Sequence, residues 1–337
     1  MYKYSFILVL SVLLFFSGCK EIIPGFDFDN LKSSKIEGLT FYNYPKVDGS
    51  TSTEPLNAVI ACILFDINYR WVPDRHNLRR IEPYLNKNDT NKFLKLIKSS
   101  QTHNSYINLI NKEADIILSA RKMSSDEKAY ADNAGVSLIE TPIALDALIF
   151  IVNPYNPVNS LTTGQIHDIY TRKITNWKEV GVNDSDWFSD FYVFDNAEMR
   201  PYVRNANSGS QELMETLVMK DLEIEWFPED YNELLVISGM VPTMDMVAWD
   251  YNAICYTVYY FKEYIVSGIN VKTIAINGII PNKETISNNS YPYVAEVYAV
   301  IRSDLEKTSM AYKLYEWLQT TAGKQAIVDS GYILYSY

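Results

Sequence analysis

Apolar residues of this chain fall into short continuous runs that alternate with stretches in which they recur at helical spacing. Six runs have the length of buried strands: 41–44, 114–118, 136–139, 147–152, 271–276 and 295–301. Helical spacing is found in three further stretches: 104–112, 212–218 and 313–320. The last helix is expected to end near Gly323, and residues 278–289 to form a loop. The alternation predicts an α/β fold with mainly parallel sheets covered by helices on both faces.

Serine or threonine stands three positions before Glu or Gln at three places, which is the spacing of a capping box: Ser124 and Glu127, Thr162 and Gln165, and Ser208 and Gln211. At the third place the first amides of the helix, at Gly209 and Ser210, have no backbone acceptor and attract an anion. Gly209 allows close approach of a ligand, and Arg204 adds a permanent charge. This stretch therefore suits a small oxyanion, although an ordinary cap beside a surface arginine is the alternative.

A second stretch of this kind precedes the apolar run from Val59 to Phe65. Pro55 suits the first turn of a helix, where its missing amide costs nothing. Ser50, Thr51 and Ser52 then form a hydroxyl-rich turn at that helix N-terminus. A plain turn is the alternative reading here.

The first residues form an apolar run that ends in a cysteine. Tyr4 to Phe16 is almost wholly apolar, and Ser17-Gly18-Cys19 follows it. The run is too short to span a bilayer, and small residues before the cysteine are typical of a cleavage site. The segment resembles a bacterial lipoprotein signal, which implies loss of residues 1–18 and lipidation of Cys19; an uncleaved signal anchor is the alternative. Both predict an exported protein held at a membrane, on its periplasmic or cell-surface side, with residues 19–40 as a tether.

The charge balance narrows the class of partner. The chain has 30 basic and 41 acidic residues, a formal charge of −11, which argues against nucleic-acid binding. An anion therefore has to be captured by local geometry. His76, His103 and His167 lie far apart without the spacing of metal ligands, so we expect structural or surface roles and no metal. Cys62 and Cys255 are flanked by apolar residues, which favours buried free thiols over a disulfide.

The order of these motifs resembles one family, the periplasmic phosphate-binding proteins of ABC transporters and, more widely, the type 2 solute-binding proteins. The matching stretches span most of residues 41–337: 48–51 with 55–56, 114–116, 146–147 with 152–154, 161–162 with 174–178, 204 with 208–211, and 290–292 with 298–300. The resemblance implies two lobes around a ligand cleft, lobe I from 41–144 and 293–337 and lobe II from 145–292. It also implies a monomer that binds inorganic phosphate and delivers it to an ABC permease in the membrane.

The resemblance assigns ligand contacts residue by residue. It places them on two stretches: Ser50, Thr51 and Ser52 in the first, and Arg204, Ser208, Gly209 and Ser210 in the second. Thr102 corresponds to a further serine of the family at a helix start, although a threonine there also suits a plain cap. Some members have an aspartate beyond the strand 114–118 that accepts the phosphate proton, whereas this chain reads Ser119-Ala120-Arg121. Arg121 is expected either to bind the ligand or to turn outward.

Three other functions have to be weighed against phosphate capture for transport. Without the family aspartate, another oxyanion such as sulfate or molybdate is the main competing ligand. A lipoprotein used for sensing or surface attachment would bind without transport. An enzyme is not expected, because the chain has no Gly-x-Ser-x-Gly elbow and no visible general base for a serine nucleophile. No catalytic residue and no cofactor are therefore predicted.

Overall fold

A computed structural model describes residues 35–74, 78–183, 197–224 and 235–335 of the chain. The predicted signal peptide, Cys19, residues 20–34 of the tether and His76 lie outside this set. Within the described ranges, no helix is both long enough and apolar enough to cross a bilayer.

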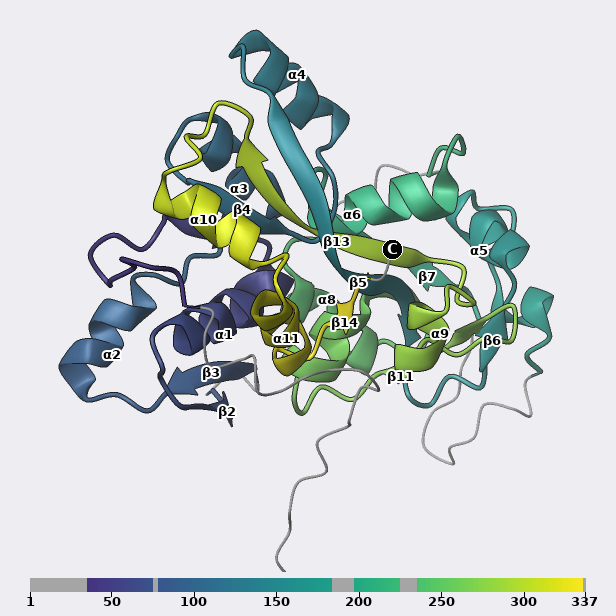
Figure 1. The fold of residues 1–337 in the computed structure, drawn as a ribbon. Helices are drawn as coiled ribbons and strands as arrows, with labels where there is room; N and C mark the ends of the chain where they lie inside the picture. The colour runs from purple at the N-terminus through teal and green to yellow at the C-terminus, as the bar shows by residue number, and fades with distance from the viewer. Residues whose placement is uncertain (1–34, 75–77, 184–196, 225–234, 336–337) are drawn as a thin grey trace, which may run out of the picture. The chain divides into compact units, whose positions relative to one another are not determined.

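Helices and strands alternate along most of the described chain (Figure 1). The helices include α1 (Glu54–Leu64), α2 (Lys87–Leu94), α3 (Thr102–Ile110), α4 (Ser125–Asn133), α5 (Thr163–Tyr170), α6 (Gly209–Leu213), α8 (Met240–Trp249), α9 (Lys283–Ser287), α10 (Met310–Trp317) and α11 (Thr321–Asp329), with the 3-10 turns η2 (Thr51–Thr53) and η3 (Trp177–Val180) and the π-helical turns η5 (Met214–Met219) and η6 (Phe261–Ile265). The strands include β1 (Val47–Gly49), β2 (Tyr69–Pro73), β3 (Arg79–Pro83), β4 (Ile116–Ser119), β5 (Leu138–Val152), β6 (Ser160–Leu161), β7 (Arg200–Pro201), β8 (Val203–Arg204), β9 (Val236–Ile237), β10 (Ala253–Val258), β11 (Lys272–Thr273), β12 (Ala275–Ile276), β13 (Val294–Arg302) and β14 (Ile333–Leu334).

One large sheet contains most of the strands that position the pocket described below; β8, which carries Arg204, pairs with β9 in a separate two-stranded sheet. The order of the large sheet is β1-β4-β13-β5-β10-β7, and β11 and β14 also pair with β5. β1 pairs with β4 and β10 with β7 in parallel, whereas the pairs made by β5 and β13 are antiparallel. The predicted α/β class is confirmed. Parallel pairs occupy the two ends of this sheet, and antiparallel pairs occupy its middle.

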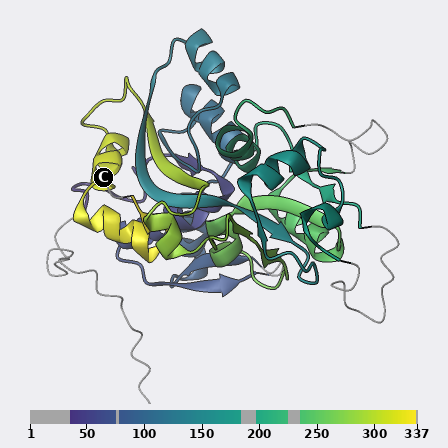
Figure 2. The same ribbon diagram turned by 90° about the vertical axis from the view of Figure 1, so that its right-hand side faces the viewer.

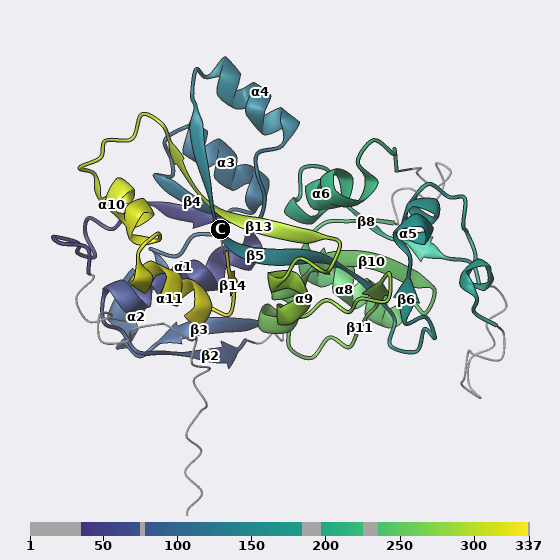
Figure 3. The ribbon, with the colours of Figure 1, turned by 45° about the vertical axis from the view of Figure 1, so that its right-hand side comes forward.

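The 15-residue strand β5 joins the two ends of this sheet. It pairs with β13 as far as Ala147 and with β10 from Leu148 onward; Figures 2 and 3 show β5 and β13 side by side. The prediction of two strands, at 136–139 and 147–152, is wrong. Pro142 does not end β5, because it lies opposite Tyr298 at a register shift of the pairing, where a missing amide disturbs the ladder least.

Three other predictions of secondary structure are wrong. Residues 41–44 form no strand, because the Thr40 amide donates to Asn43 Oδ1 at 2.6 Å in a turn. The loop predicted at 278–289 contains α9, which begins after a capping box at Asn282. Gly323 lies inside α11 and does not end the last helix. A Cβ at this glycine would lie 2.2 Å from the carbonyl oxygen of Trp317, so glycine allows α11 to begin this close to α10.

Between α1 and α3, the described residues form the antiparallel pair β2 and β3, followed by α2. The Arg79 Nη2 of β3 donates to the carbonyl oxygens of Glu263 at 2.8 Å and Val266 at 3.2 Å. Arg79 thus fastens this hairpin to the turn η6. These two bonds lie outside the pocket described below, and the buried Nε of Arg79 has no hydrogen-bond partner among the described residues.

Asp146 is a fully buried carboxylate on β5. Its Oδ1 accepts from the amides of Ala147 at 2.8 Å and Tyr260 at 2.9 Å. Its Oδ2 has no hydrogen-bond partner among the described residues. Burial raises the pKa of Asp146 to about 7, against the lowering effect of the two amides. The ionised form of this carboxyl is therefore costly to the fold.

Candidate anion site

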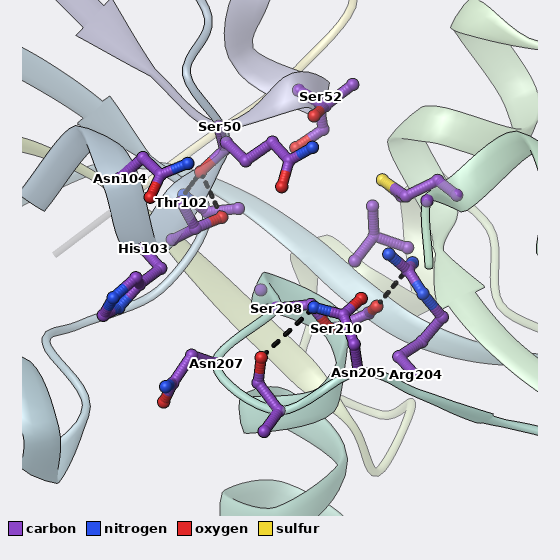
Figure 4. Close-up of a pocket in the computed structure, with 18 residues that line it drawn as sticks. Ser50, Ser52, Thr102, His103, Asn104, Arg204, Asn205, Asn207, Ser208 and Ser210 are labelled. Carbon is purple, nitrogen blue, oxygen red and sulfur yellow. Dashed lines mark hydrogen bonds between the residues drawn. The ribbon is translucent and has the colours of Figure 1, made fainter. Parts of the chain in front are cut away.

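The N-termini of four helices meet around a cavity of about 260 Å³; α8 contributes Gly239 and Met240, and the other three carry the polar lining. The segments that line it are Ser50–Ser52, Gln101–Asn104 and Arg204–Ser210, together with Ala120, Gly239, Met240 and Val258. Figure 4 shows Ser50 and Thr102 on one side, facing Ser208, Ser210 and Arg204 on the other. Residues far apart in the sequence therefore share one small polar pocket.

The first of these N-termini follows β1 and leads through η2 into α1. The Ser50 amide donates to Leu118 O at 3.0 Å, and the Thr53 amide donates to Ser50 O at 3.0 Å. The amides of Thr51 and Ser52, at the start of the helical turn, have no acceptor within it. This is the hydroxyl-rich turn that the sequence predicts, with Pro55 in the first turn of α1.

The second N-terminus belongs to α3. Gln101 precedes it with a φ of 70° and provides no side-chain cap, so the first amides of α3, beginning at Thr102, are left without an acceptor in the helix. Thr102 Oγ1 lies 2.8 Å from Ser50 Oγ, which also accepts from the Ala120 amide at 2.9 Å. This hydroxyl pair joins the first two N-termini on one side of the pocket.

The third N-terminus belongs to α6. The Ser208 amide donates to Asn205 O at 3.2 Å, and the Gln211 amide donates to Ser208 Oγ at 3.3 Å. The amides of Gly209 and Ser210 remain for a ligand. Only half of the predicted capping box forms, because Gln211 Oε1 does not return to the Ser208 amide. It accepts instead from the Arg204 amide at 3.1 Å and from the hydroxyl of Tyr256 on β10.

Arg204 is a buried cation at the edge of this pocket, with 4% of its surface exposed. Its Nε donates to Ile237 O at 3.0 Å and its Nη1 to Ser210 Oγ at 3.1 Å. Among the described residues, no carboxylate oxygen lies within 4.0 Å of its guanidinium. Burial lowers the pKa of Arg204. A buried positive charge without a counter-ion favours the binding of an anion.

Arg121 has a different environment, although it is also only 4% exposed. Its Nη1 and Nη2 bond the two carboxylate oxygens of Glu127 at 2.7 and 2.8 Å. Burial lowers the pKa of Arg121, but the bonds and the charge of Glu127 outweigh this and raise it. Arg121 does not line the pocket. It is neither at the predicted ligand position nor turned out to solvent.

The structure thus brings together Ser50, Thr51, Ser52, Thr102, Arg204, Ser208, Gly209 and Ser210, and leaves out Arg121. The sequence reading missed several other lining residues: Gln101, His103, Asn104, Asn205 and Asn207. His103 was expected to be structural or at the surface; its Nδ1 bonds Glu127 Oε1 at 3.0 Å, and Figure 4 shows its ring directed away from Arg204. The correspondence of Thr102 with a family serine is the one sequence signal for this segment; Thr102 is the first residue of α3 and not its cap.

Two predictions about cysteine and metal ligands can be compared with the described residues. Cys62 and Cys255 are buried free thiols, as predicted. In the described ranges, no group of three or more His, Cys, Asp or Glu side chains is arranged so that it could bind a metal ion. The pocket offers an anion hydrogen-bond donors and one guanidinium.

Comparison with known proteins now identifies the class. Residues 80–320 match the PBP superfamily domain, so the chain belongs to the PBP superfamily. This confirms the family resemblance seen in the sequence.

Similar proteins include several phosphate-binding proteins. The phosphate-binding protein PstS of Borreliella burgdorferi is 25% identical over 258 residues, covering 75% of this chain and 84% of its own. Protein SphX of Synechococcus elongatus is 26% identical over 241 residues, covering 67% and 64%.

Solved structures share the fold. A putative phosphate ABC transporter substrate-binding protein from Clostridium perfringens, crystallised with bound phosphate, has a TM-score of 0.58 at 22% identity, covering 86% of this chain and 98% of its own. An ABC-type phosphate transport receptor from Vibrio cholerae has a TM-score of 0.55 at 21% identity, covering 85% and 98%. These likenesses establish the fold.

Proposed function

We propose that this protein captures inorganic phosphate in the pocket and presents it to an ABC permease. The observation that carries the proposal is Arg204, a buried cation without a carboxylate partner among the described residues, beside the unbonded first amides of three helices. Charge-assisted hydrogen bonds from such groups are the stronger ones in a protein. The names of the relatives in Borreliella, Clostridium and Vibrio support phosphate as the anion.

The proposal includes a two-lobe clamp. Lobe I, residues 41–144 and 293–337, would carry Ser50 and Thr102, and lobe II, residues 145–292, would carry Arg204 and the N-terminus of α6. Phosphate would bind one side first and draw the other side onto it, because its affinity for the closed form exceeds that for the open form. With Cys19 lipidated, the clamp would stay on the outer side of the membrane beside the permease.

Direct titration tests this proposal. Calorimetry on the purified protein, dialysed free of phosphate, is expected to show saturable binding of one phosphate per chain. Absence of binding by a folded protein would contradict phosphate capture and favour the sensing or surface-attachment function.

Sulfate is a second candidate ligand, because of the charges on the described lining residues. None of their side chains carries a carboxylate, and the groups that can carry charge are Arg204 and His103. Hydrogenphosphate has a proton that needs an acceptor, whereas sulfate has none. The side-chain amide oxygens of Asn104 and Asn205 are neutral, so they can accept a hydrogen bond from hydrogenphosphate without repelling sulfate. We therefore expect sulfate to compete with phosphate.

The expected ratio of the two affinities is less than about 100. A site built to bond a ligand hydroxyl rejects an analogue without it by about 10⁴–10⁵, and that discrimination needs an acceptor that is costly to leave unpaired. Competition calorimetry with sulfate measures the ratio at one pH. A ratio above a thousand would show that another group supplies the acceptor.

Gly209 provides a test of the geometry. A Cβ at this position would lie 2.6 Å from Thr102 Oγ1, and threonine is too stiff to move aside freely. Gly209→Ala is expected to push α6 away from α3 and to weaken phosphate binding about tenfold, since overpacking costs about 1–3 kcal/mol. Gly164→Ala is the matched control, because its Cβ would lie 3.8 Å from Thr162 Oγ1, an ordinary van der Waals distance. Equal affinities in the two variants would show that α3 and α6 need not meet.

A further inference from the structure

We infer that Arg121 is a positioning residue of the anion site: it holds the backbone of Asn207, and with it the N-terminus of α6, in place beside α3. The inference rests on the proposed function. It assigns a task to a buried ion pair that lies outside the pocket and that anion binding alone does not require.

The Glu127 carboxylate is the fixed point of this arrangement, with none of its side chain exposed. Its Oε2 accepts from the Ser124 amide at 2.8 Å and from Arg121 Nη1 at 2.7 Å. Its Oε1 accepts from Arg121 Nη2 at 2.8 Å and lies 3.0 Å from Nδ1 of His103, in the first turn of α3. A carboxylate bonded on all sides holds its partners rigidly.

Arg121 extends this arrangement across to α6. Its Nη2 also donates to the Asn207 carbonyl oxygen at 3.3 Å. Asn207 has a φ of 62° and directly precedes the N-cap Ser208. Its Nδ2 donates to Asp126 Oδ2 at 3.3 Å, which gives the same residue a second tie to α4. Fixing the Asn207 carbonyl fixes the peptide that begins the turn, and so the direction of the Gly209 and Ser210 amides.

The guanidinium geometry explains why arginine fits this position. Arginine has a planar fork of donors, so it bonds both oxygens of Glu127 and still reaches Asn207. A lysine ammonium is a single compact donor group. Arg121→Lys is therefore expected to keep the ion pair with Glu127 and to lose the bond to Asn207, which separates positioning from charge compensation.

The test compares Arg121→Lys with Arg302→Lys. Arg302 is another buried arginine, and its Nη1 donates to the carbonyl oxygens of Leu109 at 3.0 Å and Ala114 at 2.9 Å, away from the pocket. For each full-length protein, stopped-flow kinetics give the phosphate association and dissociation rates, and urea unfolding without phosphate gives the stability. Arg121→Lys is expected to raise the dissociation rate about five- to tenfold with little change in association. Arg302→Lys is expected to leave both rates unchanged.

Asp126→Ala is a second variant, made at an exposed position where folding is not at risk. It is expected to raise the dissociation rate about two- to threefold through loss of the bond to Asn207. If the dissociation rate is unchanged in both Arg121→Lys and Asp126→Ala, the inference is overturned while phosphate capture stands. If Arg121→Lys does not fold, an unchanged rate in Asp126→Ala alone has the same meaning. An equal rise of the dissociation rate in Arg302→Lys would also overturn the inference. No phosphate binding by the unaltered protein would overturn the proposed function and the inference together.

Discussion

Arg204→Ala is expected to weaken phosphate binding by about 100-fold or more. The variant removes the buried cation of the pocket, and truncating one partner of a buried charge pair costs about 2–5 kcal/mol, of which about 2.7 corresponds to 100-fold. Titration calorimetry of the variant and the unaltered protein measures the difference. Arg204→Lys keeps a charge without the fork, so its affinity is expected between the two.

The matched control for Arg204→Ala is Arg79→Ala. Arg79 also donates to backbone carbonyls, those of Glu263 and Val266, but lies outside the pocket. Its removal is expected to leave phosphate affinity within about twofold. Equal affinity of Arg204→Ala and the unaltered protein would refute the assignment of the anion site to this pocket.

Asp146→Asn is expected to stabilise the protein at pH 8 and to change it little at pH 4. Burial raises the folded-state pKa of Asp146 to about 7 from its ordinary value of 3.8. Between these values the folded chain holds a proton that the unfolded chain has lost, so stability falls as the pH rises from about 4 to about 7 and stays low above that. The asparagine cannot ionise, and its amide keeps an oxygen for the amides of Ala147 and Tyr260.

Urea unfolding at pH 4, 6 and 8 measures the effect. The gain in free energy of unfolding at pH 8 is expected to be a few kcal/mol, on the order of 4 at most, because one pKa unit corresponds to about 1.4 kcal/mol. A gain that is the same at pH 4 and pH 8 would mean that ionisation of Asp146 is not its source.

Much of the site could be predicted because its parts are local. Ser50 to Ser52 and Ser208 to Ser210 lie at helix N-termini, and a helix start leaves a mark within four residues of sequence. The contribution of Gln101 to Asn104 as a whole could not be predicted in this way. It depends on the pairing of β1 with β4, which brings Ser50 to Thr102, and such contacts leave no local pattern.

The environment of Arg121 also depends on contacts that leave no local pattern in the sequence. The capping box of Ser124 and Glu127 was predicted correctly, but the pattern did not show that Glu127 would also pair with Arg121. The sequence predicts that Arg121 either contacts the ligand or is exposed. Neither prediction considers a partner of its side chain within the protein. Its position is decided by a partner six residues away and by the carbonyl of Asn207, just before α6.

The strand β5 was divided in two for a related reason. The apolar pattern gives two separate runs, 136–139 and 147–152, with a change of rhythm past Thr141 between them. The register shift opposite Pro142 lies at Val297 and Tyr298 on β13. A feature shared between two strands is visible only when both are in place.

The pairing of β5 with β13 has a mechanical consequence. In the proposed clamp, a motion that separates Ser50 from Ser210 would act on this hydrogen-bonded pair of strands, and two-stranded ribbons accommodate a larger twist than wide sheets. The pair is softest where the ladder is interrupted, at Pro142 and Tyr298. Under the proposed two-lobe clamp, opening of the pocket is therefore expected to twist this pair of strands near Pro142 and Tyr298.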